Sequence, residues 1–232
     1  MTTIIKDETL TAIGNAIREK TGKTNKLTPA EMATEIAGIT TGGDTLNEYL
    51  AGTLTAFKND EVTKIKYQFF RDLTSLETVS CKKITIIDHG GFYGCESLKQ
   101  VTLPASVTLE DSAFQNCYAL EIFNNFEHLK AIGSYAFGYC HKFSPTKIIG
   151  PVSISPNAFS GCDKLTKLFI KGDGTTLQIV AFNNCTNLTD VYTDAADKPE
   201  NWAANAFLST TTIHYGVSEQ EFDEILAAGG TE

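Results

Sequence analysis

The fold of this chain is decided by residues 87–104, which read Ile87-Asp88-His89-Gly90-Gly91-Phe92-Tyr93-Gly94-Cys95-Glu96-Ser97-Leu98-Lys99-Gln100-Val101-Thr102-Leu103-Pro104. With Phe92 as the anchor, an aliphatic residue stands five positions earlier, a cysteine three later, a leucine six later and a valine nine later. Equivalent anchors recur every 22 to 25 residues: Phe70, Phe92, Phe114, Phe137, Phe159, Phe182 and Phe207. A fixed period of this kind is typical of stacked supersecondary units.

Three more columns of residues keep their offsets from the anchor. The residue five positions before it is large and apolar: Ile65, Ile87, Leu109, Ile132, Ile154, Leu177 and Trp202. The residue just before it is small in six of the seven repeats, which lets neighbouring coils approach closely: Gly91, Ala113, Ala136, Ala158, Ala181 and Ala206. The residue six positions after it is large and apolar again: Leu76, Leu98, Leu120, Phe143, Leu165 and Leu188. These columns predict a continuous buried interior.

Five of the six cysteines form another column, three residues after the anchor: Cys95, Cys117, Cys140, Cys162 and Cys185. Each should face its equivalent in the next coil at about 4.8 Å, the spacing of neighbouring strands. A disulfide needs Cβ atoms about 3.8 Å apart. We therefore expect a ladder of buried free thiols, with bridges as the alternative. Cys81 lies outside this column, and its redox state stays open.

The segment Leu98, Val101 and Leu103 has the Leu-x-x-Leu-x-Leu spacing of a leucine-rich repeat, whose short strand buries alternate side chains. The whole unit, Phe-x-x-Cys-x-x-Leu-x-x-Val-x-Leu-Pro with its preceding isoleucine, resembles the BspA-like leucine-rich repeats of bacterial surface proteins and bacteriophages over about residues 60 to 215. The resemblance implies an α+β solenoid of parallel strands with about 22–23 residues per repeat. Pro145 cannot donate a ladder hydrogen bond and predicts a bulge or interruption there.

The chain is expected to have three parts. Residues 1–43 form a helical anchoring or oligomerisation hairpin with a flexible joint, and residues 44–217 form the solenoid, with an N-terminal cap over 44–65. Residues 218–232 form a C-terminal capping helix and tail. This last helix is predicted from the capping box Ser218-Glu219-Gln220-Glu221 and from one apolar face made of Phe222, Ile225 and Leu226. We expect it to cover the last coil.

The hairpin is predicted from Leu10, Ile13 and Ile17 at helical spacing and from a second helix that begins at Thr28. The second helix carries two further apolar residues, Met32 and Ile36. So small a unit rarely folds alone. We therefore expect it to dock on sister subunits, on a larger assembly or on the repeats.

The stretches Leu10-Thr11-Ala12-Ile13-Gly14-Asn15-Ala16-Ile17-Arg18-Glu19-Lys20-Thr21-Gly22 and Leu27-Thr28-Pro29-Ala30-Glu31-Met32-Ala33 look like the opening segment of tail and minor structural proteins from phages and prophages of Gram-positive bacteria. The resemblance spans roughly residues 4 to 39. It implies a module that binds virion proteins through residues 1–40 and is joined to a variable distal domain. A homo-oligomer is expected on the same ground.

Composition excludes several classes of function. The net charge of −9 and pI near 5.0 argue against a nucleic-acid-binding surface, which needs a basic stripe. No apolar run approaches the roughly 18 residues of a membrane-spanning helix. The first residues also lack the succession of basic, apolar and small residues that is typical of a signal peptide. We therefore expect a soluble protein without membrane insertion that does not use the general secretory route. Its expected location is the virion, assembled in the bacterial cytoplasm, with the bacterial cell surface as the alternative.

The sequence predicts no catalytic, cofactor or metal site. His141 follows Cys140, but no Cys-x-x-Cys pair provides the clustered ligands of a zinc site. Buried thiols are poor nucleophiles, and no nucleophile elbow or phosphate-binding loop is present. The segment Lys171-Gly172-Asp173-Gly174-Thr175-Thr176 partly resembles a calcium-binding loop, but it lacks the further carboxylates that such a loop supplies as ligands. We therefore expect a protein that is not an enzyme.

Solenoids usually bind through side chains repeated on one exposed face. The predicted outward strand column, ten residues after each anchor, is Ser80, Thr102, Asn124, Lys147, Phe169 and Tyr192. The candidate ligand contacts are Asn124, Lys147, Phe169 and Tyr192, for a host cell-surface protein or glycan. Alternatively, Phe169 and Tyr192 pack under the C-terminal helix or a neighbouring subunit. The resulting hypothesis is a phage structural protein (tail, baseplate or fibre-like) that presents a host-recognition array; a bacterial adhesin or a purely architectural virion protein are the alternatives.

Overall fold

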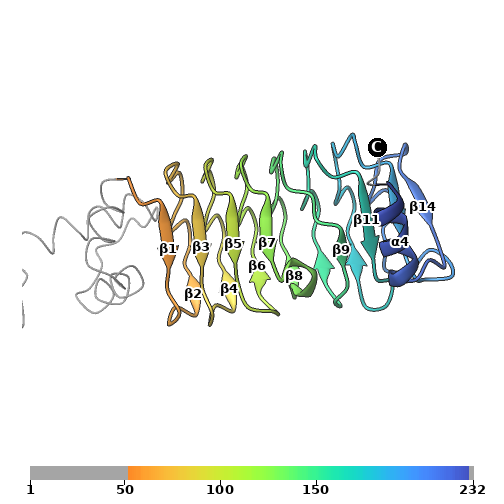
Figure 1. Ribbon diagram of the computed structural model, residues 1–232, viewed down its shortest axis with the longest axis horizontal. Helices are drawn as coiled ribbons and strands as arrows, with labels where there is room; N and C mark the ends of the chain where they lie inside the picture. The colour runs from red at the N-terminus through yellow and green to blue at the C-terminus, as the bar shows by residue number, and fades with distance from the viewer. Residues whose placement is uncertain (1–51, 230–232) are drawn as a thin grey trace, which may run out of the picture.

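The computed structural model describes residues 52–229, which form an elongated stack of coils (Figure 1). Each coil places short strands on two sides of the stack. On one side, six strands pair in parallel, and Trp202 continues their ladder with a bridge to Leu177. These strands are β2 (Lys64–Ile65), β4 (Ile86–Ile87), β6 (Thr108–Leu109), β8 (Ala131–Ile132), β10 (Ser153–Ile154) and β12 (Thr176–Leu177). Their last residues are the predicted aliphatic column, in register from coil to coil.

The opposite side carries two parallel four-stranded sheets instead of one. The first sheet consists of β1 (Ala56–Lys58), β3 (Thr78–Ser80), β5 (Gln100–Thr102) and β7 (Ile122–Asn124). The second consists of β9 (Lys147–Ile148), β11 (Lys167–Ile170), β13 (Asp190–Tyr192) and β14 (Thr212–His214). A 3-10 helix, η1 (Phe126–His128), follows β7, and the coil that leads to β9 contains Pro145. The predicted interruption at Pro145 is therefore confirmed, and so is the parallel-strand solenoid.

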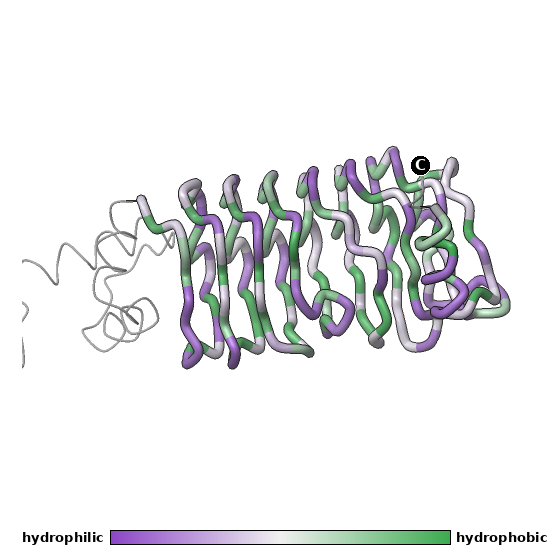
Figure 2. The backbone as a smooth tube through the Cα atoms, viewed as in Figure 1, coloured by the Kyte–Doolittle hydropathy of each residue, from purple (hydrophilic) through white to green (hydrophobic). Residues whose placement is uncertain are grey.

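The anchor phenylalanines form one continuous stack inside the array. From Phe70 to Phe207, neighbouring rings lie 4.8–5.7 Å apart between centroids, with interplanar angles of 4–19°. Aromatic pairs of this kind contribute about 0.5–1.5 kcal/mol beyond their buried area. Hydrophobic stretches accordingly recur at matching places in successive coils (Figure 2). The period in the sequence is thus the period of a buried aromatic column.

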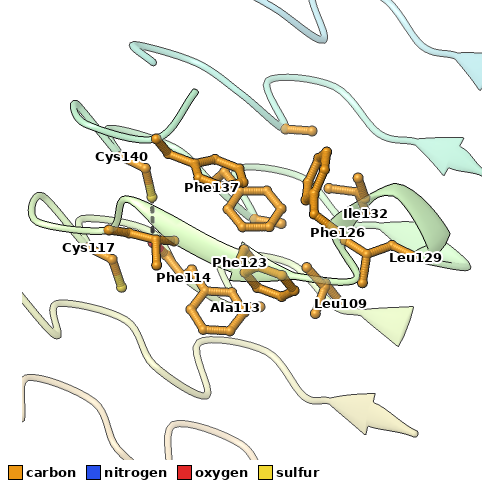
Figure 3. Close-up of a cluster of buried hydrophobic side chains, with 14 of the residues drawn as sticks. Leu109, Ala113, Phe114, Cys117, Phe123, Phe126, Leu129, Ile132, Phe137 and Cys140 are labelled. Carbon is orange, nitrogen blue, oxygen red and sulfur yellow. Dashed lines mark hydrogen bonds between the residues drawn. The ribbon is translucent and has the colours of Figure 1, made fainter. Parts of the chain in front are cut away.

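The predicted thiol ladder lies beside the phenylalanine stack. All six cysteines are free and buried. Each thiol of the column donates a hydrogen bond to an anchor carbonyl of the preceding coil, as Cys140 Sγ does to Phe114 O at 3.2 Å (Figure 3). Burial raises the pKa of Cys117, Cys140 and Cys162 far above the ordinary value, and it raises the pKa of Cys185 to about 12. These cysteines are therefore packing residues. Burial also raises the pKa of Cys81 to about 12.

An aromatic cluster fills the interior where the two sheets separate. Phe123 of β7 and Phe126 of η1 pack edge-on against Phe137 of the central stack, with centroids 5.6 Å away in both cases (Figure 3). Phe143 packs against Phe137 at 4.7 Å and against Phe126 at 5.2 Å. Interiors are packed without large voids, so these rings maintain the core across the break in strand pairing.

The turns around each anchor impose a second kind of periodicity. For the six anchors from Phe70 to Phe182, the residues two positions before and two positions after the anchor have a left-handed backbone: Gln68, Asp72, Gly90, Gly94, Ser112, Asn116, Tyr135, Tyr139, Asn157, Gly161, Val180 and Asn184, with φ between 50° and 71°. Glycine, asparagine and aspartate tolerate this conformation best. Val180 is β-branched and tolerates it worst, so it marks a strained turn.

The segment over 44–65 was expected to cap the array. Its described part, residues 52–65, instead contains β1 and β2 and forms a regular half coil. Leu54 and Phe57 are buried in the columns of Leu76 and Val79, one repeat earlier in the sequence. The repeat therefore begins before the first anchor.

Candidate functional site

The outward strand column differs between the two sheets. In the first sheet, Ser80, Thr102 and Asn124 face outward, and the Asn124 side-chain amide donates to Thr102 Oγ1 at 3.0 Å. Asn124 is exposed, as predicted for a contact residue. These three side chains are small and polar, and two of them hydrogen-bond to each other.

In the second sheet, the same column is covered by helix α4 (Glu219–Gly229). Phe169 and Tyr192 are only 1% and 7% exposed, and their rings lie 5.6 and 5.2 Å from the ring of fully buried Phe222. The exposure assigned to these two candidate contacts was therefore wrong, because the chain's own helix occupies the aromatic surface. The alternative, in which they pack under the C-terminal helix, is the arrangement found.

Lys147 also holds α4 instead of facing a ligand. Its ammonium group lies 2.8 Å from Glu219 Oε1 and 2.7 Å from Asp223 Oδ1. Desolvation lowers the pKa of Lys147, but these two hydrogen-bonded carboxylates raise it more, so the net shift is upward. The helix thus lies against the outward side chains of β9, β11 and β13, so it packs on the outer face of several of the last coils (Figure 1).

The N-terminus of α4 has the predicted capping box. The backbone amide of Ser218 donates to Glu221 Oε2 at 2.7 Å, and the backbone amide of Glu221 donates back to Ser218 Oγ at 3.2 Å. The hydrogen bonds that the Ser218 amide and hydroxyl donate to the Glu221 carboxylate lower the pKa of Glu221. They also fix where the helix begins, which places Phe222 over the aromatic pair.

An open hollow of about 330 Å³ lies at the turns after the third and fourth anchors, Phe114 and Phe137. It is lined by Asn116, Tyr118, Tyr139 and His141, and we call it the turn-edge cleft. Tyr118 and Tyr139 are 39% and 38% exposed, whereas the anchor phenylalanines beside them, Phe114 and Phe137, are fully buried. The cleft therefore presents aromatic and polar groups together, on a surface that α4 leaves open.

The side chains of the cleft hold one another in place. The rings of Tyr118 and His141 stack with centroids 5.5 Å apart, and Tyr139 meets His141 edge-on at 6.3 Å. His141 Nδ1 lies 2.7 Å from Asp163 Oδ2. A carboxylate can only accept, so Nδ1 is the donor of this hydrogen bond, and in a neutral ring Nε2 is then an acceptor. The Asn116 amide donates to the Tyr93 hydroxyl at 3.2 Å.

The side chains of the cleft come from two positions of the repeat, in two successive coils. Asn116 and Tyr139 occupy the left-handed position two residues after their anchors, whereas Tyr118 and His141 stand two residues further on. In the next coil the left-handed position is Gly161, and a Cβ there would lie 3.0 Å from the Tyr139 ring. Sequence reasoning missed the cleft because it followed the strand columns. The available signal was aromatic residues at matching turn offsets in two successive repeats.

A second hollow, of about 440 Å³, lies beside the segment 171–176, which partly resembles a calcium-binding loop. It is lined in part by Asp173 and Asp194, and Asp194 Oδ1 accepts a hydrogen bond from the Gly172 amide at 2.8 Å. Two carboxylates, one of them already bonded to the backbone, are too few for a calcium site. Within residues 52–229, no group of three or more histidine, cysteine or acidic side chains could hold a metal ion.

The anchoring hairpin lies outside the described residues. This holds for all five of its predicted apolar residues, which are Leu10, Ile13, Ile17, Met32 and Ile36. In the part of the chain that the structure covers, no helix is long and apolar enough to cross a membrane. The virion contacts and the homo-oligomer therefore remain predictions.

Three solved structures are similar to this chain, and the first of them supports the fold. A leucine-rich repeat protein of T. pallidum is similar with a TM-score of 0.53 and 18% identity, over 76% of this chain and 84% of that one. A leucine-rich repeat protein of Bacteroides ovatus gives 0.45 and 20%, over 71% and 54%. A leucine-rich cell surface protein of Faecalibacterium prausnitzii gives 0.47 and 21%, over 74% and 50%. The chain thus spans about half the length of the last two.

Sequence comparison assigns the family. No curated protein sequence matches the chain. A family model described as the BspA type leucine-rich repeat region matches six copies, over residues 53–152 and 107–226. The matched residues include the whole phenylalanine stack, the thiol ladder and the turn-edge cleft. The chain therefore belongs to the BspA type leucine-rich repeat family.

Proposed function

We propose that this protein is a non-enzymatic recognition protein, whose array binds a molecule on a bacterial host surface and whose N-terminal segment attaches it to a phage or prophage virion. The turn-edge cleft is the observation that carries the binding role, because it is the place where exposed aromatic rings and polar groups converge on a rigid frame. The attachment rests on the resemblance of residues 4–39 to phage tail proteins. Display of many copies on a virion would raise avidity.

The chemistry of the interior supports a binding role over an enzymatic one. The five ladder thiols are buried and bonded to carbonyls, and the pKa values resolved for four of them are raised, so thiolates are scarce at neutral pH. His141 is oriented by Asp163, but it faces aromatic rings and an amide instead of a nucleophile. This arrangement holds a ligand without activating one.

Binding of fluorescently labelled full-length protein to a panel of Gram-positive bacteria tests the recognition role. We expect binding to at least one strain, reduced tenfold or more by Tyr118→Ala or His141→Ala. Tyr67→Ala is the matched control, since Tyr67 is 42% exposed and stacks on His89 at 5.4 Å, outside the cleft. Equal binding by all variants would place the site elsewhere, and binding to no strain would refute the recognition role.

The virion attachment is tested separately. An antibody raised against the array should label phage particles released from the producing bacterium, and full-length protein should co-purify with tail components. Labelling confined to the surface of the producing cells would favour the adhesin alternative, with the same cleft as its binding site.

A further inference from the structure

We propose that the turn-edge cleft binds the pyranose rings of a neutral cell-surface polysaccharide, an inference that rests on the proposed recognition function and specifies its ligand. The cleft combines tyrosine rings, one histidine and one amide between two successive coils. Each of these groups has a distinct use in holding a sugar.

The size of the cleft favours a small repeating unit over a protein surface. Its volume of about 330 Å³ falls at the lower end of the roughly 300–1,000 Å³ of small-molecule sites. A stable protein interface uses about 20–30 residues a side, and four lining residues are far fewer. No aliphatic side chain lines the cleft to serve as an apolar anchor for a protein.

The aromatic groups suit the apolar side of a sugar ring. A pyranose exposes a face of C–H groups that packs on an aromatic ring while its hydroxyl groups point outward. Tyr118 and Tyr139 combine an apolar body with a polar tip, which serves both parts of such a ligand. Tyr118 is stacked on His141, and Tyr139 lies over Gly161, so both rings are positioned before the ligand arrives. This reduces the entropy lost on binding.

The polar groups suit neutral hydroxyls. With Nδ1 donating to Asp163, Nε2 of a neutral His141 ring can accept a hydrogen bond from a sugar hydroxyl, and the two tyrosine hydroxyls both donate and accept. The Asn116 carbonyl oxygen adds another acceptor, since its amide is directed at Tyr93. None of the four lining residues is a lysine or arginine, which are the groups that bind phosphate or carboxylate. The cleft therefore favours an uncharged glycan over a phosphorylated one.

The test uses a strain that binds the labelled full-length protein. Its cells are treated with periodate, which cleaves the vicinal diols of sugars, or with a protease. We expect periodate to lower binding at least tenfold and protease to leave it unchanged. Loss of binding after protease, with none after periodate, overturns the glycan inference while the recognition function stands. If no strain of the panel binds the labelled protein, the recognition function itself is refuted.

Calorimetric titration with neutral polysaccharide purified from the same cell wall locates the site. We expect Tyr118→Ala to weaken binding at least tenfold and Tyr67→Ala to change it less than twofold. Tyr139→Asn should also weaken binding, because asparagine keeps the left-handed backbone while the ring is lost. Thermal unfolding checks that the variants fold. Undiminished binding by folded Tyr118→Ala and Tyr139→Asn overturns the assignment.

Discussion

Replacing Phe222 with alanine should release α4 from the array. The side chain of Phe222 is fully buried against the rings of Phe169 and Tyr192. Truncating a buried phenylalanine costs about 3–5 kcal/mol, because the transfer free energy is lost and a cavity remains. A helix of 11 residues is marginal in water without such packing. The variant should therefore lose the helix locally while the coils stay folded.

The electrostatic contacts of α4 should matter less. Lys147 contacts Glu219 and Asp223, but the two carboxylate side chains are 46% and 55% exposed. Such ion pairs contribute about 0.2–1 kcal/mol each and weaken in salt. Lys147→Met should therefore leave α4 docked, and high salt should not release it. The aromatic anchor outweighs the ion pairs severalfold.

Hydrogen exchange of the full chain, followed by mass spectrometry, measures both effects. A loss of about 3 kcal/mol corresponds to a roughly hundredfold fall in protection, which we expect in peptides from residues 219–229 of Phe222→Ala. Glu224→Ala, on the exposed side of the helix, is the control. Unchanged protection in Phe222→Ala, or an equal loss in Lys147→Met, would refute the reasoning.

Three other predictions concern the array itself. Val180→Asn should raise the free energy of unfolding by about 1 kcal/mol, because asparagine tolerates the left-handed turn. The neighbouring change Ile179→Asn should not raise the free energy of unfolding, and thermal denaturation of both variants would show the difference. The six cysteines of native protein should react with Ellman's reagent at pH 8 only as the array unfolds, and a fast phase would contradict their burial. A hydrogen bond from His214 holds the pKa of Asp190 below its usual value. The ionised Asp190 therefore stabilises the fold above about pH 3.9, and this stabilisation is lost as the pH falls through the folded-state pKa. Asp190→Asn should destabilise the protein at pH 7 and progressively less in acid. Denaturant titrations at several pH values would measure this.

Local patterns were enough to predict the interior of this fold. The columns of Phe92, Cys95 and Leu98 repeat because each coil must bury the same groups against its neighbours, and this constraint is visible in a single sequence. The interruption of the outer sheet could also be predicted locally, because Pro145 lacks the backbone N–H that a strand donates to its neighbour. The capping box at Ser218 likewise gave the start of α4.

The position of α4 on the array could not be predicted from local sequence patterns. The sequence shows an apolar helix face with Phe222 and an aromatic outward column with Phe169 and Tyr192, but nothing local states that they meet across thirty or more residues. The turn-edge cleft was missed for a different reason. Tyr118 and Tyr139 stand at different offsets from their anchors and are exposed, so burial does not constrain them, and only the match between Tyr118 and His141 marks the cleft in the sequence.

That freedom has a consequence for how such proteins change their specificity. The six coils from Phe70 to Phe182 share a left-handed turn at the position occupied by Asn116, and the coils on either side of the cleft carry Gly94 with Glu96 and Gly161 with Asp163 at the positions of Asn116 and Tyr118. Exchanging a few side chains at these places would move, duplicate or erase a binding site while the interior stays untouched. A scaffold of this design separates what keeps it folded from what it recognises, and recognition can diverge quickly under selection.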